Sequence, residues 1–381
     1  ASYLPKVLKP FRSRIVGDEI DYPLIRLILS VTYSTRWIRL EPKASFSSIV
    51  KVPGYNRCVS TISDQVPRFL LKAFGANPKH LGKVPNRLRF RKFHMSSKSG
   101  PTGHHALWSA FWDIQHIPQS LRDDLRILAG ERFYDLMSRF SLLVNRIPTF
   151  FEQHCSFRNM CIRKIVVISD KEGKSREIAI GDYWSQSALR PLHQYLFRQL
   201  SRISQDCTHD QTKWLRKLVP RKGSSFHSID LTTATDRFPI AVQKEVLSIW
   251  FGGEFADAWH RTMVGHPFDS SQGKISYMTG NPMGLYSSWA VFAVCHHFFV
   301  YLACERANVN WKKCPYMLLG DDIVIADDEV AFHYMRILGE WDIPFNPDKT
   351  HSSPRLYEFA KQFILDETNI SPFPIAALYE Q

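Results

Sequence analysis

Two adjacent aspartates stand in the middle of an otherwise apolar segment, residues 316–326, and this arrangement constrains the fold more than any other feature of the chain. Short apolar runs precede and follow Gly320-Asp321-Asp322, which predicts two buried strands joined by a tight turn. Gly320 permits the backbone geometry that such a turn demands. A solvent-facing turn is the ordinary explanation for Gly-Asp, and by composition the tripeptide occurs by chance in roughly one chain in fifteen of this size. The hairpin alone therefore leaves the function open.

A second group of acids gives the hairpin a chemical meaning. Asp230 ends a predicted strand, residues 226–231, and Asp236 follows just ahead of Pro239. If Asp230 and Asp321 meet at adjacent strand ends, two like charges about 4 Å apart repel by roughly 4 kcal/mol at an effective dielectric of 20. Two Mg²⁺ ions bound to carboxylate oxygens relieve such repulsion and can activate a hydroxyl and stabilise a leaving pyrophosphate. The acids therefore predict phosphoryl transfer at a two-metal site, whereas Asp236 has the alternative of capping the helix that begins near Pro239.

The positive charge of the chain is concentrated at one end. The formal net charge is +13, and residues 1–100 hold 19 Lys and Arg against five Asp and Glu. The remaining residues hold 30 basic side chains against 31 acidic ones. A segregated excess of this kind is typical of a surface that binds phosphates. We therefore expect an acidic partner such as a nucleic acid.

The order of the periodic segments predicts an α+β fold, with a small antiparallel sheet packed on helices. Helical spacing covers residues 118–147, and a hairpin is predicted for residues 165–180 around the turn 169–173. Asp182 is the predicted cap of a helix that runs to about residue 203. Downstream we expect, in this order, a strand, two helices, a hairpin and another helix, at residues 226–231, 239–251, 287–306, 316–326 and 329–341.

The composition of the longest apolar run argues against a membrane protein. This run, residues 289–304, is sixteen residues long and carries His296 and His297 in its middle, so it is too short and too polar for a membrane span. We expect a buried helix, no membrane span, and packing roles for both histidines. The seven cysteines are odd in number and include no Cys-x-x-Cys, which favours reduced thiols in a reducing compartment over disulfides or zinc.

Taken together and in order, the motifs resemble those of a viral RNA-dependent RNA polymerase. The resemblance is closest to the polymerases of mitoviruses, the capsidless RNA replicons of mitochondria. Those of narnaviruses and ourmiaviruses come next. The resemblance extends over residues 90–365. It implies a right-hand polymerase with fingers and palm and a thumb that is short or absent. The motifs that carry it are residues 230–239, 280–289, 319–322, 346–351 and 357–361 in the palm, and residues 96–101, 171–176 and 180–184 in the fingers.

The resemblance also implies a division of the chain. Residues 1–100 are expected to be a basic N-terminal extension or part of the fingers, and residues 101–222 the fingers with a basic hairpin for nucleotide entry. Residues 223–366 would be the palm with the metal-binding aspartates. Residues 367–381 would be a tail or the start of a truncated thumb.

The resemblance implies a role for each acid and for one lysine. Asp230 and Asp321 would be the main ligands of Mg²⁺, for which Mn²⁺ can substitute, and Asp322 would be a nearby or outer partner. Adjacent strand residues point to opposite faces, which favours Asp321 over Asp322. Lys349 would be the general acid that protonates the leaving pyrophosphate, although a solvated lysine in a turn is the alternative. Asp236 would bind the ribose 2′-hydroxyl and so select ribonucleotides.

The remaining implied contacts are with nucleotide and RNA. Lys174 and Arg176 would hold the incoming triphosphate, with an exposed hairpin tip as the alternative. Ser287 or Ser288 would face the ribose near Asp236. A mobile glycine loop and an upstream small-residue loop would approach RNA, through Gly280, Gly284, Ser99, Gly100 and Pro101.

The leading hypothesis is therefore template-directed RNA synthesis that replicates a mitovirus-like genome in the host mitochondrion. The expected partners are the RNA template and product, NTPs, and a protein that supplies a thumb or belongs to a ribonucleoprotein. One alternative is a non-catalytic RNA-binding or ribonucleoprotein-associated protein derived from a polymerase, which the basic flank suits equally well. The intact aspartates argue against it. A mitochondrial reverse transcriptase is a minor alternative, which Asp236 and the glycine before the paired acids disfavour.

Overall fold

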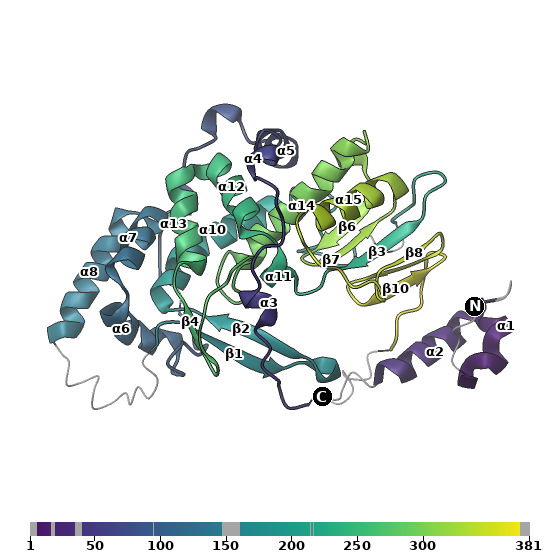
Figure 1. The fold of residues 1–381 in the computed structure, drawn as a ribbon, viewed down its shortest axis with the longest axis horizontal. Helices are drawn as coiled ribbons and strands as arrows, with labels where there is room; N and C mark the ends of the chain where they lie inside the picture. Colours follow the sequence, from purple (N-terminus) through teal and green to yellow (C-terminus); the bar gives the residue numbers. More distant parts are fainter. Residues whose placement is uncertain are drawn as a thin grey trace.

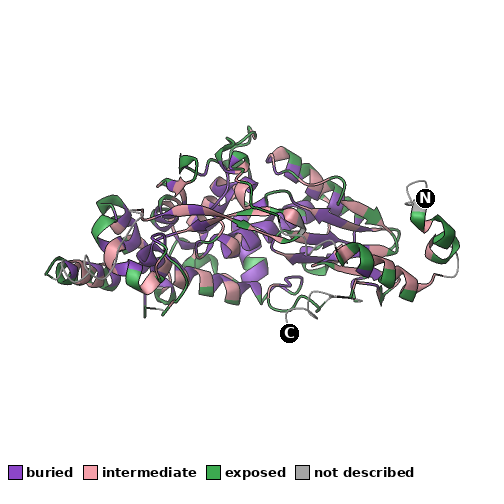
Figure 2. Cartoon of the chain, turned by 90° about the horizontal axis from the view of Figure 1, so that it is seen from below, coloured by how far each residue is buried: buried purple, intermediate pink, exposed green. Residues whose placement is uncertain are grey.

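The computed structural model describes residues 6–16, 20–34, 40–93, 95–146, 161–213, 215 and 217–373. Part of the predicted tail, residues 374–381, lies outside the described residues. The molecule is elongated, with a group of helices at one end and a set of short strands toward the other (Figure 1). Buried residues gather where these layers face one another (Figure 2). The predicted α+β class is confirmed.

The central sheet is antiparallel and has the strand order β6-β7-β3-β8. Its strands are β3 (Phe226–Asp230), β6 (Tyr316–Leu319), β7 (Asp322–Ile325) and β8 (His351–Ser353). The alternation of apolar residues fills both faces, since Met317, Leu318, Val324 and Ile325 are all fully buried. Helices α14 (Ser288–Arg306) and α15 (Asp328–Glu340) pack against each other above this sheet (Figure 1). The strands and helices predicted for residues 226–341 are therefore present.

A smaller sheet covers the other face of the central sheet. It consists of β9 (Leu356–Phe359), β10 (Gln362–Leu365) and β11 (Thr368–Asn369), in the order β11-β10-β9. The ring of Tyr357 lies 4.6 Å from the ring of Phe226, centroid to centroid. The backbone N–H of Glu358 donates to the Ser228 hydroxyl at 3.0 Å. These contacts fix the β9–β10 hairpin beside the end of β3.

The predicted basic hairpin is also present, in a sheet of its own. It consists of β1 (Lys164–Ser169), the turn η5 (Lys171–Gly173) and β2 (Ser175–Ile180). Two further strands, β4 (Phe268–Ser270) and β5 (Gly273–Ile275), extend this sheet beyond β1. No strand was predicted for residues 268–275. Strands of three residues are too short to show an alternating pattern.

Helices connect the hairpin to the central sheet. Asp182 caps α10 (Tyr183–Leu200), with its carboxylate accepting from the Ser185 N–H at 2.6 Å, as predicted. Helix α10 contacts α14 on one side and α6 and α7 on the other. Helix α13 was not predicted. The bounds of the other helices of this region are α6 (Ala106–His116), α7 (Gln119–Ala129), α8 (Glu131–Arg146), α11 (Ala234–Arg237), α12 (Ile240–Phe251), α13 (Gly253–Val264) and η6 (Trp311–Lys313).

The N-terminal part consists of short elements laid along the rest of the molecule. Helix α2 (Tyr22–Tyr33) contacts the small sheet, where the Tyr33 and Phe363 ring centroids lie 5.8 Å apart. The Ser30 hydroxyl accepts from the Phe373 N–H at 2.8 Å. The other elements are η1 (Lys6–Phe11), α1 (Arg12–Val16), α3 (Ser47–Val50), α4 (Ser60–Ser63), α5 (Val66–Phe74), η3 (Pro78–His80) and η4 (Asn86–Leu88).

Helix α14 is the buried apolar helix that the sequence predicts. Within the described ranges it is the one helix long and apolar enough to cross a membrane, yet 89% of its apolar window is buried inside the fold. His296 lies between the Gly320 carbonyl, 2.7 Å from Nδ1, and the Tyr334 hydroxyl, 2.5 Å from Nε2. His297 lies between the Tyr316 hydroxyl, at 2.8 Å, and an Asp206 carboxylate oxygen, at 3.0 Å. The packing role predicted for both histidines is confirmed.

The cysteines behave as the sequence analysis expects, as far as the structure describes them. The described cysteines are free, and four of them, at positions 207, 295, 304 and 314, are buried. Burial raises the pKa of the Cys207 thiol to about 12, which makes this thiol unreactive. Cys155 lies outside the described residues.

The His296 contacts predict a measurable effect on stability. Burial lowers the pKa of His296 to about 3, so the ring is neutral and its Nδ1–H donates to Gly320 while Nε2 accepts from Tyr334. His296→Leu keeps an apolar side chain there but leaves a buried carbonyl and a buried hydroxyl without partners. We expect the free energy of unfolding to fall by about 2–4 kcal/mol, measured by urea denaturation. Leu71→Ala, at a half-exposed site on α5, should change it by less than about 0.5 kcal/mol. Equal midpoints for His296→Leu and the wild type would contradict this account.

Candidate active site

The acids singled out in the sequence come together at one end of the central sheet. Strands β3 and β7 are antiparallel with Asp230 directly opposite Asp322. Directly opposite residues of an antiparallel pair have Cβ atoms about 4.5–5.5 Å apart. Asp321 occupies the turn between β6 and β7, next to this pair. Carboxylates about ninety positions apart in the chain are thus brought to one edge.

The turn that carries Asp321 is held from behind by α14. It is a two-residue connection, because Leu319 pairs with Asp322. Gly320 has φ of 61°, a conformation that side chains rarely adopt, and a Cβ there would lie 2.7 Å from the Trp289 indole nitrogen. The same glycine's carbonyl accepts the His296 hydrogen bond described above. Only glycine fits this close approach, so the aspartates stand on a rigid support.

Burial, and after it the neighbouring negative charge, raises the pKa values of Asp321 and Asp322. Burial and then the charge of Asp321 raise the pKa of Asp322 to about 6. Surrounding protein and then the charge of Asp230 raise the pKa of Asp321. Lys361 opposes both shifts. The site therefore holds more negative charge than its own lysines neutralise.

A small cavity, of about 170 Å³, opens at the sheet edge. Asp230 and Asp322 both line it, whereas Asp321 lies in the turn outside its lining. The sequence predicts Asp230 and Asp321 as the main metal ligands and Asp322 as a nearby or outer partner, whereas the cavity lining places Asp322 beside Asp230. The reason is that Gly320 and Asp321 form the turn, so Asp322 is the first residue of β7 that pairs with β3. The other charged or aromatic side chains of the lining are Tyr33, Lys174, Lys349, Glu358 and Lys361.

Lys349 lies beside the acids, as its predicted role requires. Its ammonium group is 3.5 Å from an Asp230 carboxylate oxygen. The segment that carries it is tied to the end of β3, since the Asn346 N–H donates to the Asp230 carbonyl at 2.8 Å. Lys349 is half exposed, so this ion pair is open to exchange with another partner.

The two basic residues of the hairpin tip have different surroundings. Lys174 reaches the cavity, together with Asp230 and Asp322. Arg176 is half exposed and forms an ion pair with Asp170 at 2.5 Å, which holds the pKa of that carboxyl below its ordinary value. Lys174 therefore lies where a phosphate contact was predicted, whereas Arg176 has its Nε on the Asp170 carboxylate.

The donor set at the edge suits a hard divalent cation. All three acids offer carboxylate oxygens, which Mg²⁺ prefers, and burial together with neighbouring negative charge raises the pKa of Asp321 and of Asp322. Within the described ranges, however, no three His, Cys, Asp or Glu side chains are already gathered as metal ligands. The residues fit the chemistry of Mg²⁺.

Asp236 lies in α11 rather than at a helix cap. Helix α12 begins after Pro239 without a side-chain cap, so the capping alternative for Asp236 is wrong. Its carboxylate instead accepts a hydrogen bond from the Ser48 hydroxyl at 2.7 Å. Burial and the charge of Glu177 raise its pKa to about 6, against the effect of Ser48.

The two predicted ribose-facing serines are both buried and engaged in packing. The Ser287 hydroxyl accepts from the Trp259 indole N–H at 2.9 Å. The Ser288 hydroxyl donates to the Asn281 side-chain carbonyl at 2.6 Å. The Asn281 backbone N–H donates to the Thr235 carbonyl, next to Asp236. Ser288 is therefore connected toward Asp236 through Asn281, and Ser287 points to Trp259.

The glycine loop is packed rather than mobile, which corrects the reason given for its glycines. Gly280 is buried, and a Cβ there would lie 2.0 Å from the Thr235 carbonyl oxygen. Gly284 has φ of 122°, and a Cβ there would lie 2.2 Å from the Ala179 carbonyl oxygen. Both glycines allow close contact with neighbouring backbone, and only Gly284 is exposed.

The upstream loop lies against α6 instead of the sheet edge. Gly100 and Pro101 are buried, and a Cβ at Gly100 would lie 2.5 Å from the Ser109 hydroxyl. Ser99 is exposed and pairs with His105 through its backbone. Of this trio, the predicted RNA contact therefore rests on Ser99.

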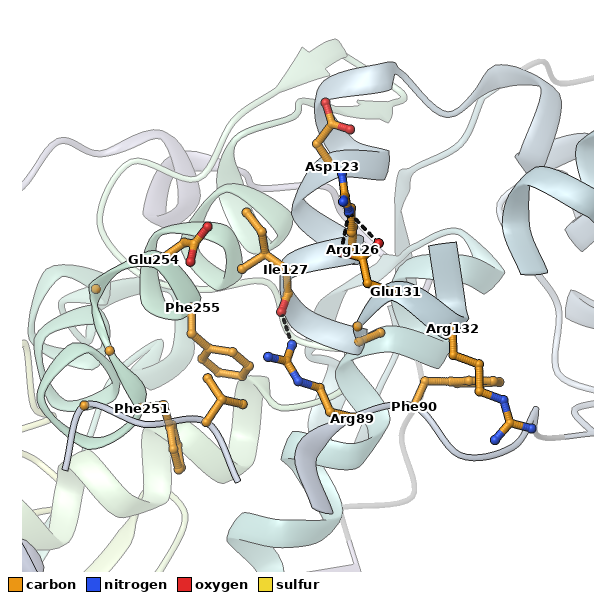
Figure 3. A pocket seen from close by; sticks show the side chains of 16 residues that line it. Arg89, Phe90, Asp123, Arg126, Ile127, Glu131, Arg132, Phe251, Glu254 and Phe255 are labelled. Carbon is orange, nitrogen blue, oxygen red and sulfur yellow. Dashed lines mark hydrogen bonds and ion pairs between the residues drawn. The ribbon is translucent and has the colours of Figure 1, made fainter. Parts of the chain in front are cut away.

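A larger cavity, of about 1050 Å³, lies between the ends of α7 and α12 and contains none of the predicted site residues (Figure 3). Two of its three arginines have partners: Arg89 donates to the Ile127 carbonyl at 2.5 Å, and Arg126 pairs with Glu131 at 2.7 Å. Acidic side chains accompany the basic ones in its lining. This cavity offers no concentration of charge or of reactive groups, so the candidate site remains at the sheet edge.

Sequence reasoning missed several residues of the site. Glu358 and Lys361 belong to a motif that was noted without assigned roles, and Asn281 lies inside the glycine motif. Those three had a signal in the sequence. Ser48 and Tyr33 had none, because both come from the N-terminal segment and reach the site only through the fold.

Comparison with known proteins was made for both sequence and structure. The family model described as mitovirus RNA-dependent RNA polymerase matches residues 87–381. The RNA-directed RNA polymerase of Cryphonectria parasitica mitovirus 1 is 38% identical over 202 residues, which are 52% of this chain and 25% of that protein. An uncharacterized mitochondrial protein of Arabidopsis thaliana is 33% identical over 192 residues, 48% of this chain and 76% of that protein. The chain thus spans about a quarter of the mitovirus protein.

The solved structures give a weaker likeness. An RNA-dependent RNA polymerase of BmCPV, in its elongation state, has a TM-score of 0.46 and 13% sequence identity, and the match covers 87% of this chain and 30% of that one. A telomerase from Candida tropicalis has a TM-score of 0.39 and 12% identity over 54% of each chain. Both scores are below 0.5, so no functional conclusion is drawn from them.

The raised pKa of Asp322 predicts a pH-dependent effect on stability. Between the ordinary aspartate pKa of about 3.9 and the folded value of about 6, the folded chain holds a proton that the unfolded chain has lost. Stability therefore falls as the pH rises through this window. Asp322→Asn should raise the free energy of unfolding by about 1–3 kcal/mol at pH 7.5, and the gain should vanish below about pH 4. Urea denaturation in the presence of a chelator measures it.

The matched control is Asp348→Asn, at an exposed position of the turn that follows Asn346. Its stability should follow that of the wild type at every pH. If Asp322→Asn is less stable than the wild type at pH 7.5, the charge of Asp322 does not destabilise the fold.

Proposed function

This chain belongs to the mitovirus RNA-dependent RNA polymerase family, and we propose that it catalyses template-directed RNA synthesis from NTPs. The carrying observation is the register that sets Asp230 opposite Asp322, with Asp321 in the adjoining turn. The family match extends over residues 87–381, which include every one of these acids. The reaction transfers a nucleotidyl group to the 3′-hydroxyl of RNA and releases pyrophosphate.

Mg²⁺ is the proposed cofactor, and Mn²⁺ is expected to replace it. Asp230, Asp321 and Asp322 would hold the metal, which would lower the pKa of the attacking hydroxyl and stabilise the leaving pyrophosphate. The carboxylate oxygens of all three acids and the raised pKa values of Asp321 and Asp322 support this choice. Trp289 and His296 contact Gly320 and so fix the turn that carries Asp321.

The basic residues around the cavity suit the triphosphate. Lys174 and Lys349 both line it, and Lys349 is already within 3.5 Å of Asp230. We assign Lys349 to protonation of the leaving pyrophosphate and Lys174, with Arg176, to binding the incoming phosphates. Asp236 is assigned to the ribose 2′-hydroxyl, with Ser288 acting through Asn281 rather than directly.

The wider role follows from the family. We propose that the chain, with RNA template and product as partners, replicates a mitovirus-like RNA in the mitochondrion. The Arabidopsis relative named above is a mitochondrial protein, which supports the compartment. The proposed architecture is a right hand, with the fingers in residues 101–222 and the palm in residues 223–366.

The first test is nucleotide incorporation. The purified chain, given an RNA template, labelled NTPs and Mg²⁺, should extend RNA, and Asp230→Asn and Asp321→Asn should each lower the rate about a hundredfold or more, because each removes charge that stabilises the transition state. Asp348→Asn is the matched control and should retain the wild-type rate.

If Asp321→Asn forms product at the wild-type rate, the assignment of Asp321 to catalysis is wrong. Salt-sensitive RNA binding without incorporation under either metal would instead favour the non-catalytic RNA-binding alternative.

The second test concerns the metal and does not depend on activity. A ligand that binds only the folded state at about ten times its Kd adds about 1.4 kcal/mol to stability. Mg²⁺ should therefore raise the melting temperature of the wild type by about 2 °C and leave that of Asp230→Asn unchanged. Differential scanning fluorimetry measures both. Equal shifts in the two proteins would place Mg²⁺ binding elsewhere.

A further inference from the structure

Residues 40–57 form a strap that passes from the hairpin to the end of α15, and nothing in the sequence motifs accounts for it. At its start, the Leu40 carbonyl accepts from the Ser169 hydroxyl at 2.8 Å, and the Lys43 N–H donates to the Ser175 hydroxyl at 2.8 Å. At its end, the Tyr55 and Trp341 ring centroids lie 5.1 Å apart. Figure 1 shows this segment, with α3, crossing in front of the hairpin and rising toward α12.

The middle of the strap is fastened to the elements around Asp236. The Met278 N–H donates to the Ile49 carbonyl at 3.1 Å. The Lys51 carbonyl accepts from the Thr279 hydroxyl at 2.8 Å and from the buried Arg237 guanidinium at 2.8 Å. Arg237 follows Asp236 in α11, so the strap is bound to the same short helix that carries the acid.

Two donors of the strap are directed at two facing acids. The Ser48 hydroxyl donates to Asp236 Oδ2 at 2.7 Å, from 188 positions away in the chain. The Ser45 N–H donates to Glu177 Oε1 of β2 at 3.3 Å. These acids repel each other, since the charge of Glu177 raises the pKa of Asp236. The strap therefore supplies the hydrogen bonds that hold both carboxylates in place.

The space beside Asp236 contains a further polar group without a partner. The Tyr277 hydroxyl is buried and has no hydrogen-bond partner within the described part of the chain. Its pKa is raised by burial and then by the charges of Asp236 and Glu177, so it lies near both acids. A buried hydroxyl left unsatisfied costs about 1–3 kcal/mol. This side of Asp236 is thus suited to receive a polar group from a ligand.

We infer that the strap is a specificity device, in which Ser48 fixes the rotamer of Asp236 so that its other carboxylate oxygen faces the ribose 2′-hydroxyl of the incoming nucleotide. A carboxylate has acceptor sites on both oxygens, and no hydrogen bond to Oδ1 is made by the described residues. Ser48 is a positioning residue, because it acts through Asp236. This inference rests on the proposed function.

The test compares ribonucleotide and deoxyribonucleotide use. For the full chain on an RNA template, kcat/KM is measured for ATP and for 2′-deoxy-ATP in the wild type and in Ser48→Ala. We expect the ATP to dATP ratio to fall about tenfold, the equivalent of about one hydrogen bond to a charged group. The fall should come from a higher KM for ATP, with dATP incorporation unchanged. A structural defect would lower kcat/KM for ATP and for dATP by the same factor.

Matched variants complete the design. Ser47→Ala changes the neighbouring exposed serine of α3 and should keep the wild-type ratio. Ser48→Thr and Ser48→Val have the same shape and differ in the hydroxyl, so Thr should retain the ratio and Val should lose it. Urea denaturation checks that each variant is folded, and the Thr and Val pair decides the matter if Ser48→Ala is not.

The outcomes separate the two proposals. If the wild type incorporates neither nucleotide, the proposed function fails and this inference fails with it. If the wild type prefers ATP and both Ser48→Ala and Ser48→Val keep that preference, only the role of the strap is overturned. Equal losses for ATP and dATP would reduce the strap to a structural tie.

Discussion

The repulsion between carboxylates at the end of the central sheet is the constraint on which the rest of this structure depends. The antiparallel register of β3 and β7 places Asp230 opposite Asp322, and protein around them keeps water from screening the charges fully. The result is a raised pKa at Asp322 and at Asp321. Carboxylates with pKa values raised in this way are typical of sites that bind a cation or catalyse a reaction. The rigid turn at Gly320 keeps Asp321 beside the other acids and so prevents them from moving apart.

That rigidity comes from the long apolar helix behind the turn. Helix α14 supplies Trp289, which fills the space that a side chain at Gly320 would take, and His296, which binds the Gly320 carbonyl. His296 is in turn fixed by Tyr334 of α15. The helix is therefore apolar because it is the core of the fold, and its histidines are buried because each has two partners. His296, one of the two histidines that make this run too polar for a membrane span, thus supports the turn that carries Asp321.

Much of this arrangement could be predicted. The two strands around Gly320, the hairpin of β1 and β2 and the cap at Asp182 each follow from a local rule, and all were found. The strands β4 and β5 were missed because segments of three residues carry little periodic signal, and helix α13 was missed although it is as long as α12. The capping role for Asp236 was wrong, since the helix after Pro239 needs no side-chain cap. The mobile glycine loop proved to be packed, because Gly280 and Gly284 lie against backbone from distant parts of the chain.

The sequence by itself determined the chemistry of the site: which carboxylates, lysines and glycines are present, and in what order along the chain. Residue type and spacing are local properties, so they can be read directly. Only the tertiary structure decided the pairing, namely that Asp322 rather than Asp321 lines the cavity with Asp230 and that Ser48 reaches Asp236. Such contacts join residues that are far apart in the chain. They depend on strand register and on the path of an irregular segment, and neither leaves a periodic trace in the sequence.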